Sequence, residues 1–238
     1  MTADPSTQES VRLTVRDGTV ISLDRVRGEK PAYVYLHGLG STRRGEKSET
    51  LLEHARARGR GFVRFDFRGH GESGGVAGHA TVSELVSDTL EILESFGPAI
   101  LVGSSLGGLC AAFAAARAPD AVRALVMLSP ALGYLPRMRR HLTPSGELIT
   151  SEGVSIRLHE RVLEDASLLD EEALPRHISV PLLIAHGTAD ETVPHALSER
   201  FFAAVPHGEK DLWLVPGGDH RLSQRIREIY ARMDRLTG

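Results

Sequence analysis

The chain has 238 residues, a formal net charge of −3 and a pI near 6.4, with 41% hydrophobic and 25% charged residues. This length allows one domain with a substantial core, and the charge gives no sign of a protein that binds nucleic acid or a membrane surface. A lone cysteine, Cys110, excludes an intramolecular disulfide. The polar start lacks the apolar region of a signal peptide, and no apolar run approaches the roughly 18 residues that span a bilayer. We expect one cytoplasmic domain, residues 1–238, without a membrane span.

The first elements read as an antiparallel hairpin. Residues 11–15 and 20–26 alternate apolar and polar side chains on either side of Asp17-Gly18, which is the pattern of two paired strands with a turn dipeptide between them. A short apolar run at 32–36 follows and ends abruptly in the sequence HGLG.

From residue 32 onward, strand patterns alternate with helix patterns. The strands are short, mostly uninterrupted apolar runs, which are typical of a parallel sheet covered on both faces. Thr81 and Glu84 form a capping box that opens one of the helices. Further strands are expected at 62–67, 99–103, 122–128, 181–185 and 212–215, and further helices at 46–58, 106–118, 195–204 and 222–236. The pattern predicts an α/β fold with a doubly wound, mostly parallel sheet.

One segment, at about 131–178, breaks this alternation and carries charges and prolines. In a doubly wound fold such an excursion lies over the carboxyl ends of the strands, where ligands bind. We expect a short cap or lid here and place the substrate-binding side chains Tyr134, Leu135 and Ile156 in it. Other apolar candidates, with core packing an equal alternative for half of the set, are Leu132, Leu148, Ile149, Val154 and Leu158.

The candidate nucleophile is Ser105. It lies in the sequence GSSLG, residues 103–107, directly after an apolar strand and at the start of a helix. This is the context of a nucleophile elbow, a turn so sharp that side chains at the flanking glycine positions would collide with neighbouring elements. The turn presents the hydroxyl at a helix N-terminus, where developing negative charge is stabilised. We favour this interpretation over that of a structural turn.

A serine hydroxyl needs a base that is itself oriented by a third group, and in this kind of fold the order is serine, acid, histidine. Asp190 follows one strand and His220 follows the last, so both side chains are expected at the same edge of the sheet as Ser105. Glu191 and Asp219 are neighbouring alternatives for the acid. Asp219 is poorly placed because it adjoins the base in sequence, and Asp190 is preferred to Glu191.

An oxyanion hole would use backbone N–H groups. One is expected from Leu106, the residue after the nucleophile, and the other from Leu39 in the HGLG loop. Two further histidines, His37 and His186, are interpreted as orienting or packing residues.

The remaining candidates are interpreted as structural or solvent-exposed residues without a functional role. His70 and His79 are taken as solvated loop residues, since no carboxylate or cysteine spacing indicates a metal site. Cys110 is taken as a small core residue. The glycines at 69–75 do not form a dinucleotide-binding fingerprint.

Five segments together resemble the α/β-hydrolase superfamily in content and order: HGLGS, FDFRGHGES, GSSLGG, HGTADETVP and GGDH. Within it, FDFRGHGES, VGSSLGG and the segment 151–166 are similar to the ABHD10-like branch of depalmitoylases and esterases and its bacterial relatives. The resemblance implies an eight-stranded, mostly parallel sheet, a serine–histidine–acid mechanism, no cofactor, and ester or thioester substrates.

We therefore expect a serine hydrolase that cleaves small-molecule acyl esters or thioesters of small to medium acyl groups through an acyl-enzyme, with Ser105, His220 and Asp190 as catalytic residues and with no metal. Two alternatives stay open. One is another reaction of the same triad, by an aminopeptidase, a perhydrolase or a carbon–carbon hydrolase. The other is a non-catalytic ligand-binding protein on the same fold.

Overall fold

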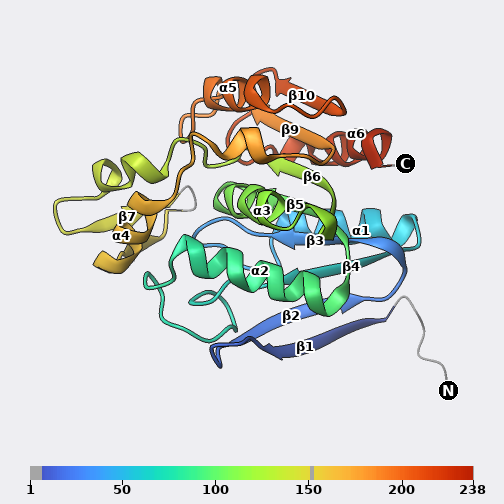
Figure 1. The fold of residues 1–238 in the computed structure, drawn as a ribbon, viewed down its shortest axis with the longest axis horizontal. Coiled ribbons are helices and arrows are strands. Elements are labelled where there is room, and N and C mark those ends of the chain that lie inside the picture. The colour runs from blue at the N-terminus through green and yellow to red at the C-terminus, as the bar shows by residue number, and fades with distance from the viewer. Residues whose placement is uncertain (1–6, 151–152, 238) are drawn as a thin grey trace.

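The structure is a computed structural model that describes residues 7–150 and 153–237. Its main feature is an eight-stranded sheet with the order β1-β2-β4-β3-β5-β6-β9-β10 (Figure 1). The strands are β1 Gln8–Thr14, β2 Val20–Val26, β3 Glu29–Leu36, β4 Arg60–Phe65, β5 Ala99–Ser104, β6 Val122–Leu128, β9 Leu182–Gly187 and β10 Lys210–Val215.

The pairing confirms the mostly parallel sheet with an antiparallel start. Strand β1 pairs antiparallel with β2, and β2 antiparallel with β4. The six strands β4, β3, β5, β6, β9 and β10, in their order across the sheet, pair in parallel. Gly18, in the turn between β1 and β2, has a φ of +87°, a conformation that glycine adopts without steric cost.

Helices cover both faces of the sheet. Helices α2 Val82–Phe96, α3 Leu106–Arg117 and α5 Ala196–Ala204 pack in one apolar core, whereas α1 Glu46–Ala57 and α6 Ile226–Thr237 pack in the other. The predicted capping box is present, since the Thr81 hydroxyl accepts from the Glu84 N–H and the Glu84 carboxylate accepts from the Thr81 N–H. The apolar strands are buried because both of their faces are covered.

The segment between β6 and β9 lies at one end of the sheet (Figure 1). It holds a two-stranded sheet of β7 Glu147–Ile149 and β8 Ser155–Arg157, and the helix α4 Glu160–Leu168. Residues 151–152, part of the segment singled out in the sequence, lie outside the described residues. Helix α4 is not predicted by the sequence pattern, because its buried face consists of only three residues, Val162, Leu163 and Ala166.

The topology brings four segments to the same edge of the sheet. The HGLG loop follows β3, Ser105 follows β5, Asp190 follows β9 and His220 follows β10. These four strands run parallel within one sheet. Among the helices of residues 7–150 and 153–237, none is long and apolar enough to cross a membrane.

Candidate active site

Ser105 has the strained backbone expected of a nucleophile elbow. Its φ is 52° and its ψ is −118°, a conformation that L-residues rarely adopt. A Cβ on Gly103 would lie 2.3 Å from the carbonyl oxygen of Gly107, and a Cβ on Gly107 would lie 2.3 Å from that of Leu36. Both flanking positions therefore require glycine, and the turn between β5 and α3 holds the serine in place.

Asp190 and His220 meet where the loops after β9 and β10 pack together. His220 Nδ1 donates to Asp190 Oδ2 at 2.7 Å. The Ala189 N–H donates to the Gly218 carbonyl oxygen at 2.9 Å. A Cβ on Gly187 would lie 2.1 Å from that same oxygen. The close approach of the two backbones therefore depends on glycine at 187.

The Asp190 carboxylate is buried and accepts several hydrogen bonds. Oδ1 accepts from the N–H groups of Thr192 and Val193 at 2.8 and 2.9 Å, and Oδ2 accepts from His186 Nε2 at 3.0 Å as well as from His220. Burial raises its pKa, but the hydrogen bonds from the two histidines and from the backbone outweigh burial and hold that pKa well below the usual range. Asp190 is therefore ionised at neutral pH.

The two alternatives for the acid are placed elsewhere. Glu191 is exposed. The Asp219 carboxylate accepts from the backbone N–H groups of Arg221 and Leu222 at 3.1 and 2.9 Å. Asp190 is thus the carboxylate that the structure brings to His220.

His186 supports Asp190 from behind. Its Nε2 lies 3.0 Å from Asp190 Oδ2 and 2.9 Å from the Val193 carbonyl oxygen, both acceptors, so Nε2 carries the proton. Its Nδ1 then accepts from the Ser198 hydroxyl at 2.7 Å. This matches the interpretation of His186 as a buried residue beside the acid loop.

The second ring nitrogen of His220 is not used by Asp190. Nε2 is buried and has no hydrogen-bond partner among the described residues. His220 and Ser105 line the same cavity. The structure therefore brings Asp190 and His220 into direct contact and places His220 and Ser105 in the lining of one cavity.

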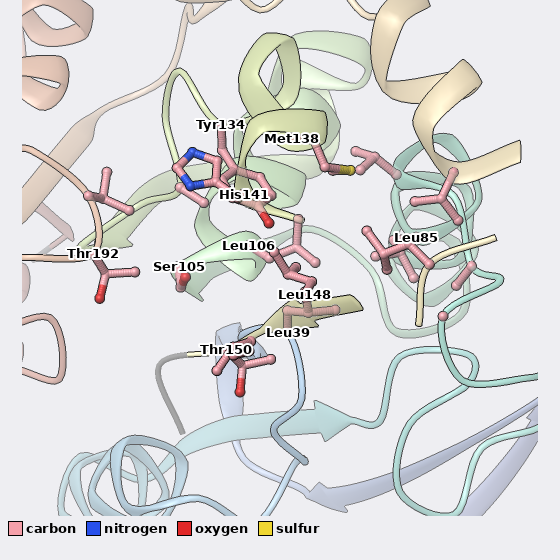
Figure 2. A pocket seen from close by; sticks show the side chains of 18 of the residues that line it. Leu39, Leu85, Ser105, Leu106, Tyr134, Met138, His141, Leu148, Thr150 and Thr192 are labelled. Carbon is pink, nitrogen blue, oxygen red and sulfur yellow. The ribbon is translucent and has the colours of Figure 1, made fainter. Parts of the chain in front are cut away.

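The HGLG loop lies against the nucleophile, since a Cβ on Gly38 would lie 3.3 Å from Ser105 Cβ. Leu39, Ser105 and Leu106 line a common cavity (Figure 2). His37 anchors the loop, because its Nδ1 donates to the Gly38 carbonyl oxygen at 2.8 Å and its Nε2 accepts from the Phe67 N–H at 3.0 Å. Burial, with the nearby His70, lowers the pKa of His37 to about 4. His37 is therefore neutral and orients the HGLG loop, in agreement with its interpretation as an orienting or packing residue.

The interpretation of His70 as a solvated residue is wrong. His70 Nδ1 donates to the Arg68 carbonyl oxygen at 3.1 Å, and its Nε2 accepts from the Gly40 N–H at 3.3 Å. Its ring lies 5.2 Å from that of His37 and lines the cavity. Burial lowers its pKa, which keeps the ring neutral and able to accept. The contact joins residues far apart in sequence, so no local spacing indicated it.

A mainly apolar cavity of about 180 Å³ opens beside Ser105. Tyr134, which the sequence analysis places among the substrate-binding residues, lines it, and so do the apolar candidates Leu148, Ile149 and Leu158. Figure 2 shows side chains of the insertion and of α2 around this cavity. Members not expected from the sequence include Gly78, Ala80, Val82, Leu85, Ala131, Met138, His141, Thr150, Val162, Thr192 and Val193.

Two predicted substrate-binding residues do not line this cavity. Leu135 is buried in the core that also contains Met138 and Val162, so its apolar side chain serves packing. Ile156 lies beneath the HGLG loop, where its Cδ1 would be 3.5 Å from a Cβ on Gly40, and lines a separate surface hollow. Both predictions rested on position in the insertion alone, which does not reveal where a side chain points.

A second cavity, of about 440 Å³ and mainly polar, also reaches Ser105. Lys47 from α1 lines it and donates from Nζ to the Ser104 hydroxyl at 2.8 Å. Sequence reasoning missed Lys47, because a single lysine in the first turn of a helix reads as a solvated side chain. The other residues around this cavity are Tyr35, Gly38, Leu39, Gly40, Ser41, Thr42, Gly45, Glu46, Ser104, Val154, His220, Arg221 and Ser223.

Other chemistry-bearing groups lie away from the site. Within the described part of the chain, no cluster of histidine, cysteine, aspartate or glutamate could hold a metal ion. Cys110 is fully buried in the core, as expected, and burial raises the pKa of its thiol.

The sheet order, the elbow and the Asp190–His220 pair define an α/β-hydrolase. Comparison with known proteins identifies the family within this class. The chain belongs to the family described as serine aminopeptidase, S33, whose model matches residues 29–174 and 139–224. The protein is a hydrolase of this family, and the resemblance to the ABHD10-like branch is confirmed.

Two relatives and one further structure are informative. The chain is 30% identical to the mitochondrial palmitoyl-protein thioesterase ABHD10 of Rattus norvegicus in an alignment of 220 residues that covers 86% of this chain and 73% of the rat protein. The structure of mouse ABHD10 superposes with a TM-score of 0.83 at 26% identity, covering 96% of this chain and 98% of that one. Est1E from Butyrivibrio proteoclasticus, with ferulic acid bound, has a TM-score of 0.80 at 23% identity, with 95% and 98% covered, and shares the fold.

Proposed function

We propose that this protein cleaves carboxylic esters or thioesters of small to medium acyl groups through a serine acyl-enzyme. Ser105 is the nucleophile, His220 the general base and Asp190 the residue that orients it. The main support for this proposal is the environment of the His220 ring. Its Nδ1 donates to Asp190 Oδ2 at 2.7 Å, while its buried Nε2 has no hydrogen-bond partner among the described residues. An imidazole so held is fixed in the tautomer that accepts a proton at Nε2.

The reaction follows from these positions. As Ser105 Oγ bonds to the acyl carbon, its proton passes to His220 Nε2, and the ionised Asp190 stabilises the resulting cation. The N–H groups of Leu39 and Leu106 are the proposed donors to the negative oxygen. When the bond to the leaving oxygen or sulfur breaks, His220 returns the proton to it. Water then attacks the acyl-enzyme by the same route, which releases the acid and restores the serine.

The lining of the apolar cavity favours acyl esters and thioesters over peptides with a free amino end. An aminopeptidase must hold the ammonium group of its substrate next to the cleaved carbonyl, and a carboxylate would do so. No aspartate or glutamate lines the apolar cavity within the described residues. The related proteins named thioesterase support the same choice.

The test is steady-state kinetics on p-nitrophenyl esters and acyl thioesters of increasing chain length, with an aminoacyl anilide as the peptide-like comparison. We expect turnover of short and medium acyl substrates, little with the anilide, and loss of at least about a thousandfold in kcat for Ser105→Ala. Near-full activity of folded Ser105→Ala would overturn the proposal.

A further inference from the structure

The segment FDFRGHGES, residues 65–73, contains a side chain that reaches the HGLG loop. The segment is the end of β4 and the tight turn after it. Gly69 and Gly71, on either side of His70, have φ angles of +72° and +50°, which suit glycine. A Cβ on Gly71 would lie 2.2 Å from Asp66 Oδ2. The two glycines therefore allow a turn that presents the side chain of His70.

The His70 ring is held by its own loop. Its Nδ1 donates to the Arg68 carbonyl oxygen at 3.1 Å. Asp66, at the start of the turn, is buried and accepts from the N–H groups of Arg43 and Glu72 at 2.7 and 2.9 Å. Because Nδ1 carries the proton of the neutral ring, Nε2 is the acceptor. The turn thus holds an acceptor nitrogen in a fixed direction.

Two histidines hold the peptide groups on either side of Leu39. The Gly38 carbonyl and the Leu39 N–H belong to one planar peptide group, and that carbonyl oxygen accepts from His37 Nδ1 at 2.8 Å. The next peptide group contains the Gly40 N–H, which donates to His70 Nε2 at 3.3 Å. With both planes held, the φ and ψ angles of Leu39 are restricted, and so is the direction of its N–H.

We propose that His70 is a positioning residue for the oxyanion hole, because its Nε2 holds the Gly40 N–H and so aims the Leu39 N–H at the substrate oxygen that becomes negative. This inference rests on the proposed function, in which Leu39 donates to that oxygen. A donor that is oriented before the charge develops costs no reorganisation during the reaction. His70 acts here through the HGLG loop.

His70 also packs against its neighbours, so the test must separate packing from hydrogen bonding. Its ring lies 5.2 Å from that of His37 and 6.5 Å from that of Phe67. His70→Phe keeps an aromatic ring at this place and removes the acceptor nitrogen. His70→Gln removes the ring and keeps an acceptor oxygen. A packing role predicts that the phenylalanine variant is the more active, and a positioning role predicts the reverse.

The test measures hydrolysis of p-nitrophenyl pentanoate and inhibition by 1,1,1-trifluorohexan-2-one, which carries the same alkyl chain. Ser105 Oγ bonds to the ketone carbon, its proton passes to His220, and the carbonyl electron pair moves to the oxygen. The adduct therefore contains an oxyanion like that of the reaction.

Losing an oxyanion donor outright costs about a hundredfold to a thousandfold in kcat, so misdirecting one in His70→Phe should lower kcat by roughly tenfold to a hundredfold. The inhibition constant of the ketone should rise by about the same factor, while KM changes by less than about threefold. For His70→Gln we expect kcat and the inhibition constant to stay within about threefold of wild type.

The matched control is His207→Phe. His207 Nδ1 also accepts a backbone N–H, that of Glu209 at 3.1 Å, but His207 lines neither cavity at Ser105. Its kcat and inhibition constant should equal those of wild type. Circular dichroism checks that each variant folds, and His70→Leu, with a smaller side chain and no acceptor, replaces His70→Phe if the latter does not fold.

The outcomes separate this inference from the proposed function. If Ser105-dependent turnover is seen and His70→Phe keeps the kcat and inhibition constant of wild type, the positioning role is overturned and the hydrolase stands. The same follows if His70→Gln loses as much activity as His70→Phe, or if the loss falls on KM alone. An absence of Ser105-dependent turnover in wild type would remove both.

Discussion

At the scale of single residues, Asp190 is the centre of the arrangement. Its Oδ2 accepts from two histidines, of which His220 faces the cavity and His186 lies buried behind. Its Oδ1 is held by two backbone N–H groups. A carboxylate with this many donors is ionised and fixed in orientation, which is what a residue that orients a catalytic imidazole needs.

Asp190→Asn tests that role. The amide is similar in size, but it carries no charge. It would offer one acceptor oxygen to four N–H donors, two from histidines and two from the backbone, so its NH2 group would oppose one pair and the His220 tautomer would no longer be fixed. We expect kcat on a p-nitrophenyl ester to fall by about a thousandfold to ten-thousandfold with little change in the circular dichroism spectrum. Retention of more than about a tenth of the activity would show that another group orients His220.

We expect His37 to make the free energy of unfolding depend on pH in the acid range. Burial and the neighbouring His70 lower its pKa from an ordinary 6.5 to about 4. The unfolded chain therefore takes up a proton below about pH 6.5 that the folded chain refuses, and the free energy of unfolding falls between about pH 6.5 and 4. Above about pH 6.5 His37 is neutral in both states, so the free energy of unfolding no longer depends on its protonation.

The comparison is His37→Gln, whose side-chain oxygen can still accept from the Phe67 N–H. Urea titrations at pH 7, 5.5 and 4.5 should show a steeper loss of stability in wild type than in the variant, with a difference on the order of 3 kcal/mol across the full interval. Parallel pH profiles for the two proteins would show that His37 is not the group responsible.

At the scale of elements, glycines set how closely the site segments approach. Gly103 and Gly107 let β5 turn into α3 beneath Ser105, and Gly187 lets the loop after β9 contact the loop after β10. The strands set the direction of each segment, whereas these glycines allow the backbones to approach more closely than a Cβ would permit. The site is therefore sensitive to substitutions that add a single carbon.

Gly187→Ala should separate Asp190 from His220. Its Cβ would lie 2.1 Å from the Gly218 carbonyl oxygen, so one backbone must move. We expect the free energy of unfolding to fall by about 1–3 kcal/mol. We also expect kcat to fall by a larger factor than KM changes. Gly208→Ala is the control, because a Cβ there meets nothing within 4 Å, and it should stay within about 0.5 kcal/mol of wild type. Equal effects of the two substitutions would contradict this account of Gly187.

The elements that carry the site were predictable, and so was the position of the insertion, but the elements inside the insertion were not. Apolar runs between turn residues locate the sheet strands, because a buried parallel strand has few polar residues. The chain order of Ser105, Asp190 and His220 then identifies three side chains that must share one edge. Helix α4 and the small sheet of β7 and β8 were not predicted, because short elements on the surface bury too few side chains to leave a periodic pattern in the sequence.

At the scale of the whole molecule, the site lies between the sheet and the insertion. The sheet supplies Ser105, Asp190 and His220, and the insertion supplies Tyr134, Leu148 and Leu158 to the apolar cavity. Which insertion residues face the cavity could not be predicted, because this depends on the path of the segment in space. That is why Tyr134 lines the cavity while Leu135, its neighbour, packs in the core.

The insertion should therefore set the length of the acyl group. Leu158→Trp would fill part of the cavity of about 180 Å³, so we expect kcat/KM to fall for the longer members of a p-nitrophenyl ester series and to change little for the acetate. Leu168→Trp is the control, since Leu168 is 84% exposed and lies away from the cavity. A uniform loss across all chain lengths with Leu158→Trp would show that this cavity does not hold the acyl chain.

The most direct test of the central claim is intact-mass analysis after treatment with a fluorophosphonate, which labels only an activated serine. We expect one adduct on wild type, its absence in Ser105→Ala, and slow labelling in a variant in which His220 is replaced by glutamine. An adduct that persists in Ser105→Ala, or no adduct on folded wild type, would contradict the assignment of Ser105, His220 and Asp190 as a catalytic triad.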